Sequence, residues 1–331
     1  MKVCVVGLGA IGSYLASCLE KGGCNLSALC RESSVDFLQN NGIQIRNKNE
    51  CHRFPISVDH DPNRLGPQDY VIVSMKTHQS WAVADTLEPL LNPQTKVVVV
   101  QNGIPWWYFY DLAGPFRDQT LISVDPEARQ MKTIGAERAI GCVAYTTASQ
   151  SAPGVTEVMN AGHFRFGDPS SAEDARLAPL LAVLTSGGLS CSHVADIRYH
   201  VWHKLLGNVC LNPVSVLTGA TMDVIATDPG LRQVCLAMMH EATAVAQRLG
   251  ITLEGSPETR LDHSATLGAH RTSMLQDLDA GRPIEVDSLT GAVSEIADIL
   301  DHPTPMIDAI LALVKQRGRE AGVYPAFPKI T

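Results

Sequence analysis

The sequence predicts an α/β fold, in which a doubly wound parallel sheet is followed by an all-helical C-terminal domain. Short apolar runs rich in β-branched residues alternate with helical segments as far as Val100, a pattern that favours a parallel sheet over a sandwich. Alternating segments follow over 118–166, and beyond Leu177 the periodicity is almost purely helical. Because 331 residues exceed one ordinary core, we expect two domains, 1–195 and 196–331.

The composition excludes several classes of protein. A hydrophobic content of 45% with 18% charged residues is typical of a compact globular enzyme. The formal net charge of -8 disfavours a nucleic-acid partner, and the lack of a long uninterrupted apolar stretch disfavours a membrane span. Nine cysteines without a Cys-x-x-Cys pair favour a reducing cytoplasm, and the histidine spacings predict no metal site.

The N-terminal elements can be placed in chain order. Residues 2–6 form a β-branched run, which ends in a glycine-rich turn, and helical periodicity continues from there to about Lys21. Further buried strands are expected at 26–29, 70–75 and 97–100, with a helical segment at 81–91 before the last of them.

The glycine-rich turn is the motif Gly7-Leu8-Gly9-Ala10-Ile11-Gly12. It follows a predicted strand and opens a helix, which is the context of a Rossmann-type dinucleotide-binding domain. Gly7 would make the tight turn, Gly9 would let the backbone approach a pyrophosphate, and Gly12 would allow close packing of helix on strand. The helix N-terminal amides would then face the anion. The alternative is a glycine-rich turn that binds no ligand.

The end of the second strand indicates which dinucleotide binds. An acid about 20 residues beyond the glycines would bind the ribose hydroxyls of NAD. This chain has Cys30-Arg31 there, and a guanidinium suits a 2′-phosphate, so the sequence favours NADPH. Glu32 follows directly, and the alternative for Arg31 is a solvated arginine at a loop start.

The C-terminal half contains further strands and then helices. The sequence predicts strands at 139–147, 155–159 and 163–166, which are separated by Pro153-Gly154 and Gly162. A helical domain beside the open end of the sheet would create a cleft at the carboxyl ends of the strands. Helices are expected at 177–184, 200–212, 231–249, 264–280, 284–300 and 304–318.

One helix in this half carries a polar stripe. Lys204, Asn208 and Asn212 recur every four residues and therefore share one face of an otherwise apolar helix. Asparagine is a poor helix former and is costly to bury, so the stripe needs partners. Those partners are either a ligand or a buried network within the protein.

At this point the sequence resembles the ketopantoate reductase (2-dehydropantoate 2-reductase) family over essentially its whole length. The matches are separated along the chain and occur in the family's order. Besides the glycine motif they are Met75-Lys76, Gln101-Asn102-Gly103, Pro153-Gly154, Trp202-x-Lys204 to Asn212-Pro213, Thr272-Ser273-Met274-x-x-Asp277 and Arg282-Pro283-Ile284-Glu285-Val286-Asp287.

The resemblance implies an NADP-dependent oxidoreductase acting on a CH-OH group, which reduces ketopantoate to pantoate in pantothenate biosynthesis. It implies that Lys204 is the general acid, which fits a cation aimed at a developing alkoxide. Glu285 would accept a hydrogen bond from a substrate hydroxyl or the product alcohol and would also line the cofactor site. A homodimer is a family-level expectation. Lys76 would contact both cofactor and substrate, Asn102 the cofactor, and Asn208, Asn212 and Ser273 the substrate.

Each assignment has a structural alternative. Lys76 and Asn102 end strands, where polar residues often cap or form turns. Glu285 follows Pro283 near an expected helix start, where the helix dipole alone favours an acid. Ser273 lies in a helical pattern and could bond to its own backbone. Asp287 is interpreted as structural.

The substrate and the activity also have alternatives. Five consecutive aromatic residues, Trp106 to Tyr110, either pack in a core or line a pocket for a bulkier substrate. A pocket would favour a related reductase of another branched or aromatic 2-oxo acid. The third hypothesis is a non-catalytic NADP-binding sensor, which the presence of Lys204 disfavours.

Overall fold

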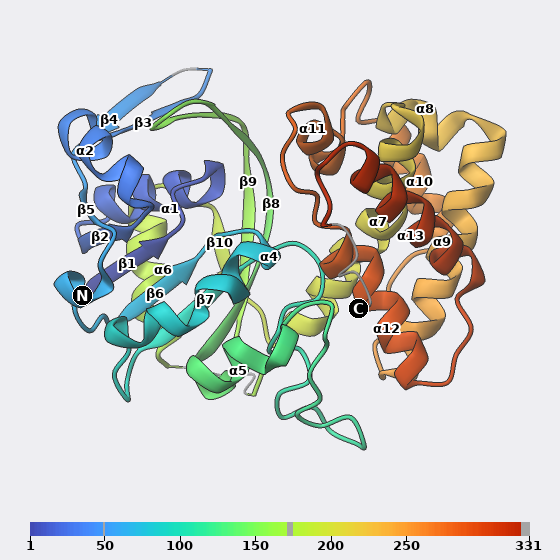
Figure 1. The fold of residues 1–331 in the computed structure, drawn as a ribbon, viewed down its shortest axis with the longest axis horizontal. Helices are drawn as coiled ribbons and strands as arrows, with labels where there is room; N and C mark the ends of the chain where they lie inside the picture. Colours follow the sequence, from blue (N-terminus) through green and yellow to red (C-terminus); the bar gives the residue numbers. More distant parts are fainter. Residues whose placement is uncertain (49, 171–174, 326–331) are drawn as a thin grey trace, which may run out of the picture. The chain divides into compact units, whose positions relative to one another are not determined.

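The computed structural model describes residues 1–48, 50–170 and 175–325, and the chain divides into two compact units (Figure 1). The first comprises Met1–Gln101 and Pro105–Ile197. The second comprises Arg198–Thr331 together with the short segment Asn102–Ile104, which leaves the first unit in the middle of its sequence. None of the described helices is long and apolar enough to cross a membrane.

The first unit is built on a mixed sheet of ten strands among the described residues, in the order β4-β3-β9-β8-β7-β6-β1-β2-β5, with β10 beside β9. Its central part is parallel, as the sequence predicts, whereas β3–β4 and β8–β9 are antiparallel pairs. The strands are β1 (Lys2–Val6), β2 (Asn25–Leu29), β3 (Ile43–Arg46), β4 (Cys51–Phe54), β5 (Ser57–Asp59), β6 (Tyr70–Val73), β7 (Lys96–Val100), β8 (Ala139–Ala152), β9 (Val155–Gly167) and β10 (Cys191–His193).

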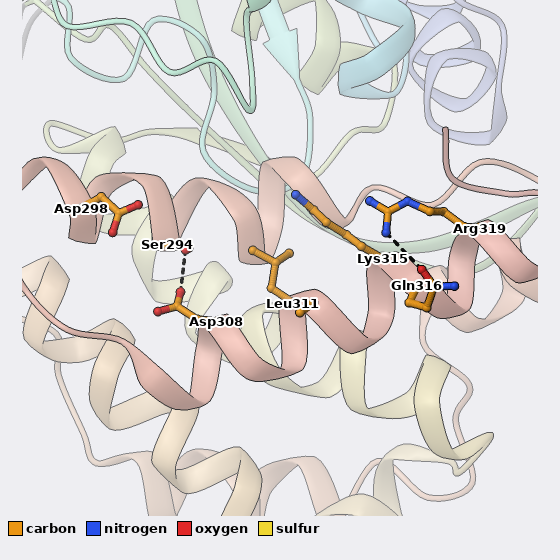
Figure 2. Close-up of a pocket in the computed structure, with 8 residues that line it drawn as sticks. Ser294, Asp298, Asp308, Leu311, Lys315, Gln316 and Arg319 are labelled. Carbon is orange, nitrogen blue, oxygen red and sulfur yellow. Dashed lines mark hydrogen bonds between the residues drawn. The ribbon is translucent and has the colours of Figure 1, made fainter. Parts of the chain in front are cut away.

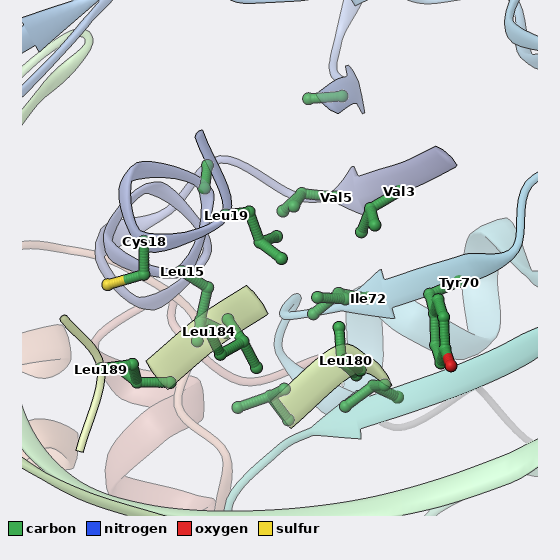
Figure 3. Packing of buried hydrophobic residues seen from close by; sticks show 14 of the residues in the cluster. Val3, Val5, Leu15, Cys18, Leu19, Tyr70, Ile72, Leu180, Leu184 and Leu189 are labelled. Carbon is green, nitrogen blue, oxygen red and sulfur yellow. The ribbon is translucent and has the colours of Figure 1, made fainter. Parts of the chain in front are cut away.

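Helices cover this sheet and bury its central strands. Every residue of β6 and β7 is buried, which explains why these strands appear in the sequence as continuous apolar runs. Leu15 and Leu19 of α1 pack in the same cluster as Leu180 and Leu184 of α6 (Figure 3). The helices of this unit are α1 (Ala10–Lys21), α2 (Glu32–Asn41), α3 (Pro62–Leu65), α4 (Thr77–Ser80), α5 (Arg129–Thr133) and α6 (Leu177–Ser186).

Two expectations for this unit need correction. The segment expected as a helix at 81–91 is a 3₁₀ helix, Trp81–Leu90, with Pro89 inside it. The two strands expected at 155–159 and 163–166 are one long strand, β9, which pairs with β8 across register shifts. Gly162 does not interrupt it, because its left-handed φ of 61° lets the backbone pass close to the carbonyl oxygen of Tyr145.

The second unit is helical, as expected, but its helices differ from the prediction in several places: the helix expected at 200–212 is longer, α8 was not predicted, and two further boundaries differ. The single helix expected at 264–280 is interrupted, because α10 ends at Ala265 and α11 begins at Ser273 with Thr272 as its cap. The helix expected from 284 opens with a π-helical turn, Asp287–Gly291. The helices are α7 (Ile197–Thr218), α8 (Met222–Thr227), α9 (Pro229–Arg248), α10 (Pro257–Ala265), α11 (Ser273–Asp279), α12 (Ala292–Ile299) and α13 (Pro305–Glu320).

Candidate active site

The three motif glycines between β1 and α1 have three different surroundings. Gly7 has a left-handed φ of 92°, and a Cβ there would lie 2.5 Å from Met75 Cγ. A Cβ on Gly12 would lie 2.0 Å from the carbonyl oxygen of Gly7, so helix and turn touch at this point. No atom lies within 4 Å of the position that a Gly9 Cβ would take. The turn is therefore tight at Gly7 and Gly12 and accessible at Gly9.

The N-terminus of α1 suits an anion. Gly9 is its N-cap, no side chain caps the helix, and no acidic residue lies in its first turn. The first amides of a helix have no partner within the helix, and the helix dipole makes this end positive. The backbone of Leu8, Ala10 and Ile11 completes the turn, so the residues present fit the pyrophosphate of a dinucleotide.

Arg31 lies directly after β2 and is the N-cap of α2. Its side chain is exposed, and we find no hydrogen bond or ion pair of its guanidinium among the described residues. The neighbouring strand β5 ends alongside it, since Leu29 pairs with Asp59. The sequence analysis does not single out Asp59, the residue that this pairing brings to the end of β2. The backbone N–H groups of Asp61 and His60 lower the pKa of Asp59 below its usual value.

Lys76 follows β6 and is the N-cap of the short helix α4, where its carbonyl oxygen accepts hydrogen bonds from the amides of Gln79 and Ser80. Its side chain is half-buried. The ends of β6 and β7 are tied together here, because Gln101 Nε2 donates to the carbonyl oxygen of Met75 over 3.1 Å. The structural role expected for a residue at a strand end is thus present at Lys76, through its backbone.

Asn102 and Lys204 meet, although they lie far apart in the sequence. Lys204 Nζ donates a hydrogen bond to Asn102 Oδ1 over 2.7 Å. Lys204 comes from α7, and Asn102 comes from the turn that follows β7. Both belong to the second unit, so this contact is internal to one compact body.

The turn that carries Asn102 is docked on the π-helical segment. The amide of Ala292 bonds to the carbonyl oxygen of Asp287 rather than to that of Ser288, as the wider π turn requires. The released Ser288 carbonyl accepts a hydrogen bond from Ile104 N over 2.9 Å. Gly103 has a φ of 86°, and a Cβ there would lie 2.0 Å from the same Ser288 oxygen. Only glycine fits this position.

The polar stripe predicted on α7 is present. Asn208 is half-buried, and Asn212 is 4% exposed. Within the described part of the chain, we find no hydrogen bond of either side-chain amide. A buried network that satisfies both amides is therefore not observed, and two amides on the face of Lys204 remain available to a ligand.

Ser273 is the first residue of α11 rather than an interior helical residue, and its side chain is exposed. The preceding Thr272 caps the helix by accepting from Leu275 N over 3.2 Å. Thr272 Oγ1 also lies 2.5 Å from Ser215 Oγ, and Ser215 in turn donates to the carbonyl oxygen of Asn212. This chain of hydrogen bonds fixes the start of α11 against α7.

Glu285 lies just before the π-helical turn, outside any regular helix, and is half-buried. Its neighbour Ile284 donates its amide to the carbonyl oxygen of Val323. Asp287 forms an ion pair with Lys315 over 2.9 Å and accepts from the hydroxyl of Tyr324 over 3.0 Å. Asp287 thus holds the C-terminal segment.

The aromatic run is part of the core of the first unit. Four of the five residues, Trp106, Trp107, Tyr108 and Phe109, are each at most 3% exposed, and Tyr110 is half-buried. A Cβ on Gly141 would collide with the Trp107 ring, which shows how closely that ring packs on β8. These residues pack as a core, and the structure gives no support to a pocket lined by them.

An open groove of about 470 Å³ lies elsewhere, between α12 and α13 (Figure 2). Several of its polar side chains bind one another or their neighbours. Ser294 donates to Asp308 over 2.6 Å, and Arg319 donates to Gln316 over 3.4 Å. No residue that the sequence motifs indicate lines this groove, so it is not the candidate site.

Comparisons with known proteins cover nearly the whole chain. The family model described as Ketopantoate reductase PanE/ApbA matches residues 3–171, and the model described as Ketopantoate reductase PanE/ApbA C terminal matches residues 196–318. The 2-dehydropantoate 2-reductase of Mesorhizobium japonicum is 39% identical over 325 residues, which is 98% of this chain and 100% of that protein.

Solved structures agree with these matches. A crystal structure of a candidate ketopantoate reductase from Ralstonia solanacearum MolK2 has a TM-score of 0.93 at 39% identity and covers 97% of this chain and 99% of that chain. D-mandelate dehydrogenase with NADH and anilino(oxo)acetate has a TM-score of 0.83 at 20% identity and covers 98% of this chain and 100% of that chain. At such low identity, the second likeness concerns the fold alone.

Proposed function

Because the chain belongs to the ketopantoate reductase family, we propose that it reduces ketopantoate to pantoate with NADPH, as an enzyme of pantothenate biosynthesis. The reaction adds one hydride to the keto carbon and one proton to the keto oxygen, and NADPH supplies the hydride. The protein must supply the proton and must stabilise the alkoxide that develops as the carbonyl is reduced.

The observation that carries this proposal is the 2.7 Å hydrogen bond from Lys204 to Asn102. It orients the ammonium with a neutral amide oxygen. The Lys204 ammonium, oriented in this way, stabilises the developing alkoxide and donates its proton to the keto oxygen.

The remaining polar residues of the second unit bind the substrate in this proposal. The Asn208 and Asn212 amides have donors and acceptors to offer on the face of Lys204, and Ser273 offers an exposed hydroxyl for the substrate carboxylate. Glu285 accepts a hydrogen bond from a substrate hydroxyl and lines the cofactor site, while Lys76 contacts both ligands. A buried aromatic run gives no reason to prefer an aromatic 2-oxo acid.

The cofactor is assigned to the glycine turn of the first unit. Residues 7 to 12 hold the pyrophosphate, Arg31 binds the 2′-phosphate, and Asn102 contacts the cofactor from the turn after β7. Nucleotide binding is thus assigned to residues 1–195, and substrate binding with catalysis to 196–331. All nine cysteines are free, which suits a cytoplasmic location.

Replacing Lys204 tests the proposal. We expect Lys204→Met to lower kcat with ketopantoate by about 10²- to 10⁴-fold, the usual contribution of a general acid. Lys204→Arg should recover little, because a guanidinium does not release its proton. The control is Lys132→Met, which removes an exposed ammonium from α5. NADPH oxidation is followed with ketopantoate and with pyruvate. The proposal fails if wild-type turnover of ketopantoate is no faster than turnover of pyruvate, or if Lys204→Met is as active as the control.

A further inference from the structure

A glutamine from the far end of the β8–β9 hairpin reaches the glycine turn. Gln150 is exposed and lies near the tip of β8, and its Nε2 donates to the carbonyl oxygen of Leu8 over 2.9 Å. The distal half of this hairpin curves away from the central strands, and β9 pairs there with β3 (Figure 1). A register shift lies between Gln150 and Ala152, and such irregularities redirect side chains.

The contact fixes one peptide plane of the turn. All described peptide bonds are trans, and in a trans peptide the N–H points opposite to the C=O of the same unit. The Leu8 carbonyl is held on one side by Gln150 and, over 3.2 Å, by the hydroxyl of Ser13. The Gly9 amide, which belongs to the same peptide, therefore points away from both donors.

A second side chain fixes the preceding peptide in the same way. Ser74 at the end of β6 donates to the carbonyl oxygen of Gly7 over 2.7 Å, which sets the direction of the Leu8 amide. Hydrogen bonds accepted by a carbonyl also polarise its peptide, which makes the N–H on the other side a stronger donor. Because the surroundings of Gly9 are open, an amide held in this way is accessible to an anion.

We propose that Gln150 is a positioning residue for the dinucleotide, which holds the Leu8–Gly9 peptide so that the Gly9 amide binds the pyrophosphate. This inference rests on the proposed function, because it requires that the turn binds NADPH. It assigns to the β8–β9 hairpin a role in cofactor affinity that its place in the sheet does not indicate.

Gln150→Ala and Gln150→Glu test the inference, and Ser151→Ala is the matched control. The glutamate keeps the size of the side chain, but as a carboxylate it has no proton to donate. Ser151 is the exposed next residue on β8, and its hydroxyl bonds to Glu157 instead of the turn. Thermal melting of all three variants checks that each is folded.

The readouts separate a role at the pyrophosphate from a general structural role. Dissociation constants are measured by titration without substrate, for NADPH and for adenosine 2′-monophosphate, which has no pyrophosphate. We expect both Gln150 variants to bind NADPH about threefold to tenfold more weakly, the weight of one hydrogen bond. Affinity for adenosine 2′-monophosphate, kcat and the KM for ketopantoate should be unchanged.

Two results would overturn the inference alone. One is unchanged NADPH affinity in Gln150→Ala, and the other is an equal loss of affinity for NADPH and for adenosine 2′-monophosphate. A wild-type protein that binds no NADPH would overturn the proposed function and this inference together. The loss of NADPH affinity in both Gln150 variants, with Ser151→Ala like wild type, supports it.

Discussion

Alanine at Gly12 should lower the stability of the protein, whereas alanine at Gly9 should weaken NADPH binding, although the two positions are three residues apart in one motif. A Cβ on Gly12 would lie 2.0 Å from the Gly7 oxygen and 2.3 Å from Ser74 Oγ. Overpacking of this kind costs about 1–3 kcal/mol, and the upper part of the range applies because a backbone carbonyl has to move. The gain in helix propensity is at most about 1 kcal/mol. Gly12→Ala should therefore lower the free energy of unfolding by about 1–2 kcal/mol.

Gly9→Ala should leave stability almost unchanged. Gly9 has a φ of -74° and a ψ of -169°, a conformation that alanine adopts without strain, and its surroundings are empty. Alanine is a poorer N-cap than glycine, which destabilises the folded protein by about 0.5–1 kcal/mol. Alanine also lowers the conformational entropy of the unfolded chain, which stabilises the folded protein by about the same amount. The added methyl group, however, occupies the approach to the turn. We expect NADPH to bind at least about tenfold more weakly, as when one charge-assisted hydrogen bond is lost.

Thermal melting and NADPH titration on the same preparations measure the two effects. A change of 1–2 kcal/mol corresponds to a fall in Tm of roughly 2–8 °C for a unit of this size. The reasoning is refuted if Gly12→Ala melts at the wild-type temperature, since the close approach would then be absent. It is equally refuted if Gly9→Ala binds NADPH as wild type does, since the turn would then not be where the cofactor approaches.

Three further predictions concern the Asn102 turn, Arg31 and the cysteines. Gly103→Ala should lower kcat about tenfold or more, because its Cβ cannot lie beside Ser288 O and the turn that holds Asn102 must move; steady-state kinetics beside a melting curve measure this, and an unchanged kcat contradicts it. Arg31→Ala should weaken NADPH binding about tenfold or more and leave NADH binding unchanged, as titration with both would show; an equal loss for both contradicts it. Burial raises the pKa of Cys4 and of Cys18 to about 12, so iodoacetamide at mildly alkaline pH should label the exposed Cys51 first; mass spectrometry reads the order, and early labelling of Cys4 or Cys18 contradicts it.

The sequence predicts best those elements whose signal is local. The central strands are buried on both faces, so their apolar runs are uninterrupted, and the glycine motif follows the first of them directly. The stripe on α7 is visible because a helix repeats its face every four residues. The short strands β3, β4 and β5 have no such signal. The strand β3 alternates only over Ile43–Arg46, and its partner β9 lies more than a hundred residues further along the chain.

The helix cap at Thr272 and the π turn could not be predicted from the periodicity of the sequence either. The helical pattern across 264–280 hides a break, because Thr272 caps α11 and Ser273 begins it. A π turn at Asp287–Gly291 has nearly the same apolar pattern as an α-helix, so periodicity alone does not reveal it. The candidate site residues could be named from the motifs, but the partner of Lys204 could not, because it depends on where the turn after β7 is attached.

That attachment positions one hydrogen-bond partner of the proposed proton donor. Asn102 follows β7 in the sequence, yet Asn102–Ile104 belongs to the same compact unit as Lys204. The π turn releases the Ser288 carbonyl, which binds Ile104 N, and Gly103 permits the close approach. The hydrogen bond between Lys204 and Asn102 therefore lies within one compact unit. Asn102, which the predicted boundaries place in the cofactor domain, thus also accepts a hydrogen bond from the proposed acid, Lys204.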